Sequence, residues 1–478
     1  MTVPGLLLNG EWQKKTGAGI HTVRSPYSGD ALGEVALASQ ADLDGILDAA
    51  VAGAALWRST PAHQRTAILL KAASLADERV DELARTISNE TGKSIREARG
   101  EASRAGEIMR LSAFEGSQRY GDSLPLDANL GTGLDKIGFT IPQPVGVVVA
   151  ITPFNYPSLL VLHKVGPALA AGNAVILKPA LSAPLTAIHL TQCFLDAGLP
   201  PGVLGLVNGS GSELGSALVS DSRVNKVSFT GSTAVGENIT RIAGIKKLSL
   251  ELGASSPVIV TKHADLDQAA HSISLGGYIN AGQVCIAAQR IIVEASIHDD
   301  FLAALTPKVE AISIGDPSLD ETMVGTLISE KEAIRVEQAI KNAVADGARL
   351  LTGGERSGTL ITPAIVDNVP GDHDFAQQEL FGPAVSITEA KDLDDAIAIA
   401  NSTQYGLGAG IFTHDQDESI RAMRGIDSGV VHINWTPLWR ADLMPYGGIK
   451  ASGIGKEGVR TTVHEMTEWK TVIMHSRP

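Results

Sequence analysis

The sequence predicts an α/β protein with two doubly wound parallel sheets, and three observations lead to this fold class. Short β-branched runs alternate with helix-length segments between residues 145 and 231. A second series of the same kind begins near Pro257 and continues to residue 435. The chain of 478 residues is long enough for about three structural units. Strands that alternate with helices form right-handed crossovers, which give a parallel sheet covered on both faces.

The N-terminal part is predicted to be mostly helical, because alanine, glutamate, arginine and leucine recur at helical spacing from Asp42 to Arg119. Residues 121–144 break this pattern with glycine, aspartate, proline and threonine, so we expect an extended arm there. The first alternating series then predicts strands over 145–152, 174–179, 203–209 and 226–231, with helices over 157–172, 184–198 and 212–220 between them.

The second series predicts strands over 257–260, 290–294 and 430–435, and helices over 265–282 and 331–345. Residues 461–474 form a predicted terminal strand that has no hairpin partner of its own. Because an unpaired strand edge exposes hydrogen-bonding groups, we expect this strand to pair with the 121–144 arm or with another subunit.

The composition indicates a globular protein in a reducing compartment. Hydrophobic residues make up 44% of the chain and charged residues 19%, which is typical of a protein with a large core. The formal net charge of −14 opposes binding to nucleic acids and to anionic membranes. Two cysteines, Cys193 and Cys285, cannot form a disulfide framework, and the sequence predicts neither a signal peptide nor a membrane-spanning stretch. We therefore expect a cytoplasmic protein.

Two glycine patterns compete for binding a phosphate group. Gly209, Gly211 and Gly215 lie between a predicted strand and a helix, but their spacing is one residue longer than the dinucleotide-binding pattern GxGxxG. Gly231 and Gly236 also join a strand to a helix, where backbone N–H groups and the helix N-terminus would meet a pyrophosphate. From glycine spacing alone, a tight turn explains either pattern equally well.

Cys285 and two polar residues are candidates for the chemistry. Cys285 lies in the small-residue segment GQVCIAAQR, whereas Cys193 shares an apolar helical stripe with Ile188 and is expected in the core. A lone cysteine is more often a packing residue than a nucleophile. Glu251 follows an apolar strand and is either a surface charge or a general base, and Asn155 is either a ligand-binding residue or a helix cap. The twelve histidines show neither HxxxH nor HExxH, so no metal site is expected.

Seven ordered motifs resemble the aldehyde dehydrogenase superfamily, from about Leu8 to the C-terminus. They are TPFNYP with Asn155, ILKPA with Lys178, SFTGSTAVG with Gly231 and Gly236, LELGA with Glu251, GQVCIA with Cys285, QELFGPA with Glu379 and Phe381, and MPYGGIKASGIGKEG. The resemblance implies the aldehyde dehydrogenase fold and an NAD(P)-dependent enzyme whose nucleophile is Cys285. The Asn155 amide and the Cys285 N–H would receive the oxyanion, and Glu251 would activate the water that hydrolyses the thioester.

The same resemblance implies a cofactor site. Its expected residues are Thr152, Pro153, Phe154, Lys178, Gly211, Phe229, Gly231, Ser232, Glu379 and Phe381. Lys178 would bond the adenosine ribose, Ser232 the pyrophosphate, and Glu379 the nicotinamide ribose. Leu181 stands where many NAD-selective members have an acid, so we expect NADP to be accepted as well as NAD. Ala254 replaces the second glycine of the LELGG pattern, which is a mild change.

The resemblance also implies a domain organisation and an oligomer. The cofactor-binding domain would span residues 1–120 and 141–251, and the catalytic domain residues 252–457. An oligomerisation arm and tail would span residues 121–140 and 458–478. In this family such a ribbon joins subunits, so a homodimer or homotetramer is expected.

The substrate is expected to be a small and anionic aldehyde. Residues 439–450 and the GQVCIAAQR segment resemble a branch that contains lactaldehyde, phosphonoacetaldehyde and phosphonoformaldehyde dehydrogenases. Arg104 and Arg440 would hold a phosphonate, phosphate or carboxylate group, and Tyr156 would line the same site. Relatives that use phosphates often have an arginine directly before the cysteine, where this chain has Val284. An arginine that merely covers apolar surface explains Arg104 equally well.

Four alternatives stay open. A pocket for neutral or aromatic aldehydes could use Phe154, Tyr156, Trp435 and Trp439. A CoA-acylating dehydrogenase would use the same cysteine, but Glu251 argues against it. A cysteine hydrolase would need a histidine beside Cys285, for which His163 and His432 are candidates. A non-catalytic structural relative would tolerate the loss of Cys285 or Glu251, and both are present.

Overall fold

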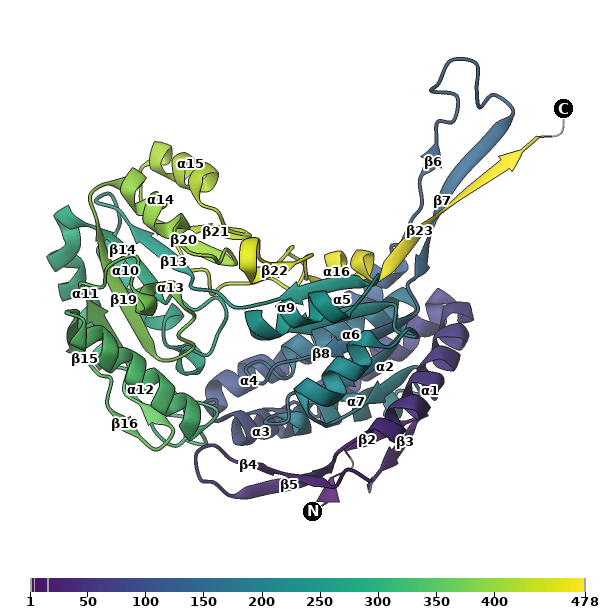
Figure 1. Cartoon of the computed structure of the whole chain (residues 1–478), viewed down its shortest axis with the longest axis horizontal. Coiled ribbons are helices and arrows are strands. Elements are labelled where there is room, and N and C mark those ends of the chain that lie inside the picture. Colours follow the sequence, from purple (N-terminus) through teal and green to yellow (C-terminus); the bar gives the residue numbers. More distant parts are fainter. Residues whose placement is uncertain (1, 4, 15–16, 477–478) are drawn as a thin grey trace.

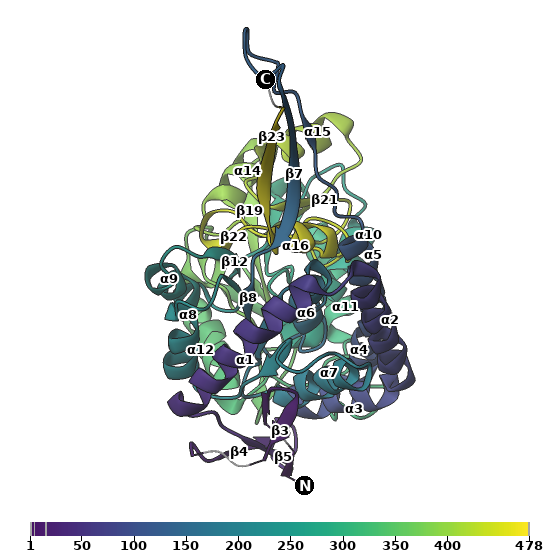
Figure 2. The ribbon, with the colours of Figure 1, turned by 90° about the vertical axis from the view of Figure 1, so that its right-hand side faces the viewer.

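The computed structural model describes residues 2–3, 5–14 and 17–476, which form two large sheets flanked by helices and a β-ribbon that projects away from both (Figures 1 and 2). The predicted cofactor-binding domain includes residues 1, 4 and 15–16, and the predicted tail includes residues 477–478; these positions lie outside the described residues. Within the described ranges, no helix combines the length and the apolar character needed to cross a membrane.

The N-terminal part is a small sheet followed by five helices. Its strands are β1 (Thr2–Val3), β4 (Ile20–Arg24) and β5 (Ala31–Ala36), and its helices are α1 (Gln40–Ser59), α2 (Ala62–Glu78), α3 (Val80–Thr91), α4 (Ile95–Ser103) and α5 (Ala105–Ser117). Ser39 and Asp42 form a capping box at the start of α1. Gly92, with φ of 74°, ends α3 in the left-handed conformation that glycine adopts without steric cost. The predicted helical character of this region is confirmed.

The first large sheet has five parallel strands at its centre, in the order β12-β11-β8-β9-β10. Val148 and Ala150 join the core on one face, and Val147 and Val149 join the core on the other, so helices cover both faces. The elements are β8 (Val147–Ile151), α6 (Leu159–Ala171), β9 (Ala174–Lys178), α7 (Pro184–Asp196), β10 (Leu204–Leu206), α8 (Ser216–Ser220), β11 (Lys226–Thr230), α9 (Thr233–Ile242) and β12 (Lys247–Glu251).

Antiparallel strands close both edges of this sheet. They are β2 (Leu6–Leu8) and β3 (Glu11–Gln13) at one edge and β22 (Gly453–Ile454) at the other. Because β22 pairs with β12, the chain returns to the first sheet within the range predicted for the catalytic domain. The predicted domain boundaries stay a prediction.

The order of the strands reverses at β8. From β8 the chain continues through β9 to β10 on one side, and it then returns to β11 on the other side of β8. Doubly wound sheets bind ligands at such a reversal, beyond the carboxyl ends of the strands. Residues 152–156, after β8, and residues 231–232, after β11, lie at this edge.

The second large sheet has the order β15-β18-β19-β14-β13-β20-β21 and is parallel except for β15. Val258 and Val260 face one core and Ile259 the other. The elements are β13 (Pro257–Val260), α10 (Leu266–Gly276), β14 (Arg290–Glu294), α11 (His298–Glu310), α12 (Glu330–Ala345), β15 (Arg349–Thr352), β18 (Ala364–Asp367), α13 (Asp374–Gln377), β19 (Ala384–Ala390), α14 (Leu393–Asn401), β20 (Gly408–Phe412), α15 (Gln416–Gly425) and β21 (Val430–Ile433), with a small hairpin of β16 (Arg356–Ser357) and β17 (Leu360–Ile361).

The ribbon consists of β6 (Ser123–Leu124), β7 (Lys136–Pro144) and β23 (Thr467–His475), and α16 (Val459–Glu465) precedes its last strand. Strands β23 and β7 are antiparallel from the pair Thr467–Pro144 to the pair His475–Lys136. The predicted terminal strand over 461–474 begins too early, because residues 461–465 belong to α16, but its predicted pairing with the arm is confirmed within one chain. Figures 1 and 2 show that the ribbon extends beyond the two sheets.

Candidate active site

The predicted nucleophile lies in an irregular loop between α10 and β14. The predicted helix over 265–282 is too long, because α10 ends at Gly276 and the backbone turns left-handed at Asn280 and Ala281, with φ of 52° and 54°. This turn carries Cys285 back toward the carboxyl end of β8. There the Asn155 amide donates a hydrogen bond to the Gln283 carbonyl at 2.9 Å. The structure thus brings Cys285 and Asn155 together, as the motifs predicted.

Cys285 and Asn155 line one cavity of about 110 Å³ between the two large sheets. Its other lining residues are Arg104, Tyr156, Leu159, Leu160, His163, Val284, Ile286, Leu438, Arg440 and Tyr446. All three residues predicted to bind substrate are therefore at this cavity. Its volume suits a small aldehyde rather than a large aromatic one.

The thiol of Cys285 has one side-chain partner among the described residues, the Tyr446 hydroxyl, at 3.1 Å. Burial raises the pKa of the Cys285 thiol to about 12, and the Tyr446 hydrogen bond acts in the opposite direction. Burial also holds the pKa of Tyr446 well above its ordinary value, so the phenol keeps its proton. Tyr446 belongs to the quoted MPYGGIK segment, but no sequence signal indicated that it reaches the cysteine.

Glu251 ends β12, and its buried carboxylate has no hydrogen-bond donor among the described residues. A Cβ at Gly447 would lie 2.6 Å from Glu251 Oε1, so the glycine leaves room for the carboxylate. Burial and the neighbouring Glu457 carboxylate raise the pKa of Glu251 well above its ordinary value. An unpaired carboxyl group beside a nucleophile can take a proton from water, which is what a general base requires.

A second buried carboxylate, Glu457, was missed by the sequence reasoning. It forms an ion pair with Lys164 and lies 3.6 Å from the Arg440 guanidinium. Burial would raise the pKa of Glu457, but Lys164 and Arg440 outweigh burial and lower it. Glu457 therefore stays charged while Glu251 favours its neutral form. This difference in protonation arises from their neighbours in the folded chain.

The two arginines at the cavity already have protein partners. Arg104 forms an ion pair with Asp442, which also contacts His163 at 3.1 Å. Arg104 lies at the junction of α4 and α5, as the last cap of one helix and the first cap of the next. Arg440 lies over the ring of Tyr446, 3.9 Å from its centroid, and its Nε and Nη2 atoms have no hydrogen-bond partner among the described residues. Arg440 thus has donors to offer a ligand, whereas Asp442 neutralises Arg104.

The histidine that a cysteine hydrolase would need beside Cys285 is absent from the described contacts of the thiol. His163 lines the cavity but contacts Asp442, and burial lowers its pKa to about 4. His432 packs against Trp439 instead, with ring centroids 6.4 Å apart. Cys193 is fully buried in α7, as expected of a packing residue.

A second cavity, of about 330 Å³, lies at the carboxyl edge of the first sheet. It is lined by Ile151, Lys178, Gly211, Ser212, Gly215, Ser216, Val219, Phe229, Ala234, Val235, Asn238, Ile239 and Ile242. Burial lowers the pKa of Lys178 to about 8, and its ammonium has no partner among the described residues. A buried cation without a partner and an apolar wall fit an adenosine whose ribose carries hydroxyl or phosphate groups.

The first glycine pattern lines this cavity, and the second precedes a helix that lines it. Gly211 and Gly215 line it directly, in a π-helical turn over Gly211–Gly215, and Gly231 and Ser232 precede α9, whose first turns form the opposite wall. The prediction preferred the second pattern for the phosphates, and the structure places this pattern at the start of a helix that lines the cavity. The N-terminus of α9, with Ser232 at the cap, would favour a pyrophosphate.

The residues predicted at the nicotinamide end lie near the junction of the two sheets. Phe154 follows β8 and packs edge-on against Phe381, with ring centroids 6.0 Å apart. Glu379 accepts a hydrogen bond from the Ala254 N–H at 3.2 Å, and burial raises its pKa to about 7. Thr152 and Pro153 connect β8 to this region. Groups from both sheets therefore surround the predicted ribose position.

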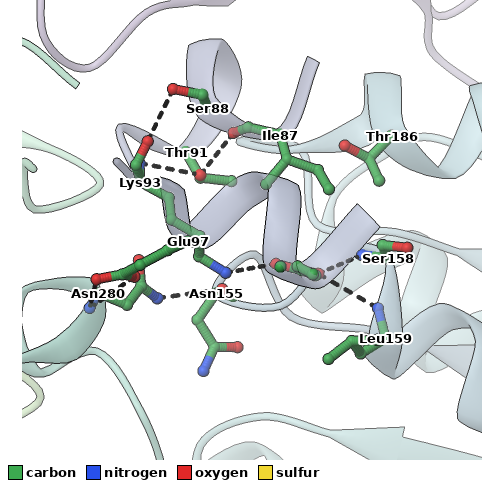
Figure 3. Close-up of polar contacts among 12 residues, drawn as sticks. Ile87, Ser88, Thr91, Lys93, Glu97, Asn155, Ser158, Leu159, Thr186 and Asn280 are labelled. Carbon is green, nitrogen blue, oxygen red and sulfur yellow. Dashed lines mark hydrogen bonds and ion pairs between the residues drawn. The ribbon is translucent and has the colours of Figure 1, made fainter. Parts of the chain in front are cut away.

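Glu97 of helix α4 belongs to a polar network that reaches Asn155 through Asn280 (Figure 3). The Glu97 carboxylate accepts two contacts from the Asn280 N–H, at 3.0 and 3.1 Å. The Asn280 side chain donates to the Asn155 carbonyl at 3.1 Å and to the Gln283 carbonyl at 3.3 Å. Glu97 thus holds the left-handed turn of Asn280, and Asn280 holds Asn155.

A second part of the network holds the chain on the other side of Asn155 (Figure 3). Lys93 and Glu101 form a buried ion pair, and Glu101 accepts hydrogen bonds from the N–H groups of Ser158 and Leu159 at 2.8 and 3.3 Å. The Lys93 ammonium lies 3.7 Å from the ring centroid of Tyr156. The sequence reasoning missed these residues, because their partners are distant in the chain.

Known proteins share the fold and the motifs of this chain. The family model described as "Aldehyde dehydrogenase family" matches residues 12–472. The chain is 43% identical to 3-sulfolactaldehyde dehydrogenase of Priestia aryabhattai over 473 residues, 98% of each protein, and 37% identical to lactaldehyde dehydrogenase of Methanococcus vannielii over 98% of this chain and 100% of that protein. The structure of NADP-dependent glyceraldehyde-3-phosphate dehydrogenase from Bacillus halodurans C-125, complexed with NADP, superposes with a TM-score of 0.97 at 34% identity over 100% of each chain.

Proposed function

Because the chain belongs to the aldehyde dehydrogenase family and has its fold, we propose that it oxidises a small anionic aldehyde to the carboxylic acid with NAD or NADP. The observation that carries this proposal is the cavity where the Cys285 thiol, the Asn155 amide and two arginines meet. A bound nicotinamide ring would accept the hydride.

The residues at the cavity have distinct roles in this reaction. Cys285 Sγ attacks the aldehyde carbon and forms a thiohemiacetal. The Asn155 amide has one N–H free beside its bond to Gln283, and together with the Cys285 N–H it stabilises the oxyanion. Loss of hydride leaves a thioester on Cys285. Glu251 takes a proton from the water that attacks this thioester, so the acid is released and the thiol is restored.

The anionic substrate class rests on Arg440 and on the relatives. Two of the similar proteins are named for a sulfonate-bearing and a phosphate-bearing aldehyde. The Nε and Nη2 atoms of Arg440 make no hydrogen bond among the described residues, although Nη2 lies 3.6 Å from Glu457. They would bond such a group, or a phosphonate or carboxylate, and each charge-assisted bond would contribute about 1.5–3 kcal/mol. Val284 supplies no charge, so the group held here is a small one.

A neutral hydroxyaldehyde is the second candidate substrate. Asp442 pairs with Arg104 and Glu457 lies 3.6 Å from Arg440, so both cations at the cavity are partly neutralised, and a relative is named for lactaldehyde. Glu251 argues against transfer of the thioester to CoA, because a water-activating carboxylate would compete with that transfer.

The test is to assay 3-sulfolactaldehyde, glyceraldehyde 3-phosphate and lactaldehyde with each cofactor, following absorbance of the reduced cofactor. We expect Cys285→Ala to abolish turnover while binding of NADP is retained. Arg440→Ala should raise KM for the charged aldehydes by roughly tenfold to a hundredfold and change KM for lactaldehyde little, whereas any loss of kcat through the Cys285 thiolate should be the same for all three aldehydes. Arg104→Ala serves as the comparison, since its charge is already paired. Equal KM increases for charged and neutral aldehydes in Arg440→Ala would reject the anionic class.

The assembly and the compartment belong to the same proposal. Ile137, Ile141, Trp469, Ile473 and Met474 are exposed on the ribbon, which supports a homodimer or homotetramer joined through it. Both cysteines are free thiols, which supports a cytoplasmic location.

A further inference from the structure

The Tyr446 hydroxyl contacts the reacting sulfur. Its oxygen lies 3.1 Å from Cys285 Sγ, and the tyrosine side chain belongs to a residue only 3% exposed. No other side chain among the described residues makes a hydrogen bond to this sulfur. The phenol is therefore the group that decides whether a negative charge on the sulfur has a hydrogen-bond donor.

Tyr446 is held firmly in this position. Its backbone exchanges two hydrogen bonds with Glu457, of 3.0 and 2.6 Å, and Glu457 is itself anchored by the ion pair with Lys164. The Arg440 guanidinium lies against the ring face, 3.9 Å from the centroid. A cation over the ring draws electron density from the phenol oxygen, which makes the O–H a stronger donor.

We propose that the Tyr446 hydroxyl is the hydrogen-bond donor that stabilises the Cys285 thiolate, and that Arg440 strengthens this donor from the face of the ring. Tyr446 keeps its proton throughout, so it donates a hydrogen bond and transfers nothing. The inference deepens the proposed function, because it explains how a thiol in a buried cavity becomes a nucleophile. A hydrogen bond to a charged group would increase the thiolate population by roughly tenfold to a hundredfold.

Of the other charged groups around the thiol, some favour the thiolate of Cys285 and others oppose it. Arg440 also favours the thiolate directly, and Glu251 and Glu379 oppose it. The groups that line the cavity from the packed elements are Arg104, Tyr156, His163, Arg440 and Tyr446. A test must therefore change the Tyr446 oxygen and leave these charges in place, which Tyr446→Phe does because it keeps the ring under Arg440.

The experiment measures the rate of Cys285 alkylation by iodoacetamide against pH, in the full-length enzyme without aldehyde or cofactor. Mass spectrometry quantifies the product at Cys285, and Cys285→Ala gives the background from Cys193. In Tyr446→Phe we expect the midpoint of the pH profile to move upward and the rate at neutral pH to fall about threefold to tenfold. The fall in rate is smaller than the fall in thiolate population, because a more basic thiolate is more nucleophilic.

A matched control is Tyr278→Phe, which removes another buried hydroxyl, one that donates to the Ala364 carbonyl at 3.0 Å. Its alkylation profile should coincide with that of the wild type. Replacing Tyr446 by 3-fluorotyrosine, a more acidic phenol, should move the midpoint downward, and this variant keeps the size of the side chain.

The outcomes are distinct. Coincident profiles for Tyr446→Phe and the wild type would overturn the inference, and so would an equal upward movement in Tyr278→Phe. If the wild type oxidises no aldehyde while Tyr446→Phe still moves the profile, the proposed function fails and the role of Tyr446 stands, because alkylation requires neither substrate nor cofactor.

Discussion

Glu251 is a buried carboxylate that must lose its proton before it can act as a base. Its oxygens have no donor, and burial together with Glu457 raises its pKa. The basic form therefore increases as the pH rises through a pKa well above that of an ordinary carboxyl group. Hydrolysis of the thioester should accelerate with rising pH over the same range.

Glu251→Gln should still produce a burst of reduced cofactor equal to the number of active sites, followed by slow turnover, because acylation does not require the base. Steady-state turnover of this variant should no longer rise with pH over that range, since an amide does not titrate. Stopped-flow absorbance at several pH values measures both effects. A variant with no burst but normal alkylation of Cys285 would mean that Glu251 acts before the thioester forms.

Lys178 and Leu181 decide the choice between NAD and NADP. The Lys178 ammonium has no partner among the described residues, and no acid stands at position 181 to repel a 2′-phosphate. We expect NADP to be accepted as well as NAD. Lys178→Met should raise KM for NADP about tenfold more than KM for NAD, and Leu181→Glu should oppose NADP in the same assay. A wild-type preference for NAD beyond about 10³-fold in kcat/KM, roughly 4 kcal/mol, would contradict this prediction.

Helix α4 acts at the scale of an element, because its first turn supports the proposed oxyanion site. Ser94 caps the helix, and Glu97 in its first turn accepts the Asn280 N–H. Burial raises the pKa of Glu97 to about 7, yet its carboxyl oxygens remain acceptors in either protonation state. The position of Asn155 thus depends on a helix more than 50 residues before it.

Glu97→Ala should lower kcat by about tenfold or more and change KM little, because Asn155 would lose its support and the oxyanion is bound only in the transition state. The free energy of unfolding should fall by about 1–3 kcal/mol, the cost of an unsatisfied buried N–H. Glu107→Ala, at an exposed position of α5, is the control. Steady-state kinetics and urea unfolding measure the two effects. A loss of stability with unchanged kcat would mean that Glu97 stabilises the fold but does not support catalysis.

At the scale of the whole molecule, the ribbon is the surface through which subunits would join. Its strands β7 and β23 pair over their full length but leave apolar side chains exposed, including Trp469 and Ile473. Ile473→Glu should dissociate the oligomer and leave the monomer folded, because the side chain contributes little to the monomer core. Sedimentation equilibrium measures this, with Lys470→Glu as the comparison on the same strand. A wild-type chain that sediments as a monomer would contradict the proposal.

The two sheets and their order along the chain were predictable from the sequence. Alternating strands and helices are local patterns, and a parallel sheet follows from them because right-handed crossovers leave few other arrangements. The motifs also indicated Cys285, Asn155 and Lys178, since Lys178 is the last residue of β9 and the other two lie in loops next to a strand. The helix break at Arg104 and the early end of α10 were not predictable, because capping and left-handed turns there depend on distant partners such as Glu97.

The tertiary structure alone decided which charges are paired and which are available. Tyr446 meets Cys285 across 161 residues, and Asp442 binds Arg104 across 338, distances that no local pattern encodes. The same holds for Glu251 and Glu457, which are both buried acids but differ because Glu457 forms an ion pair with Lys164, whereas the Glu251 oxygens have no hydrogen-bond partner among the described residues. Residue types and their spacing thus determined the class of chemistry. The reactivity of each group depends on burial and on through-space neighbours, and these exist only once the two sheets have packed together.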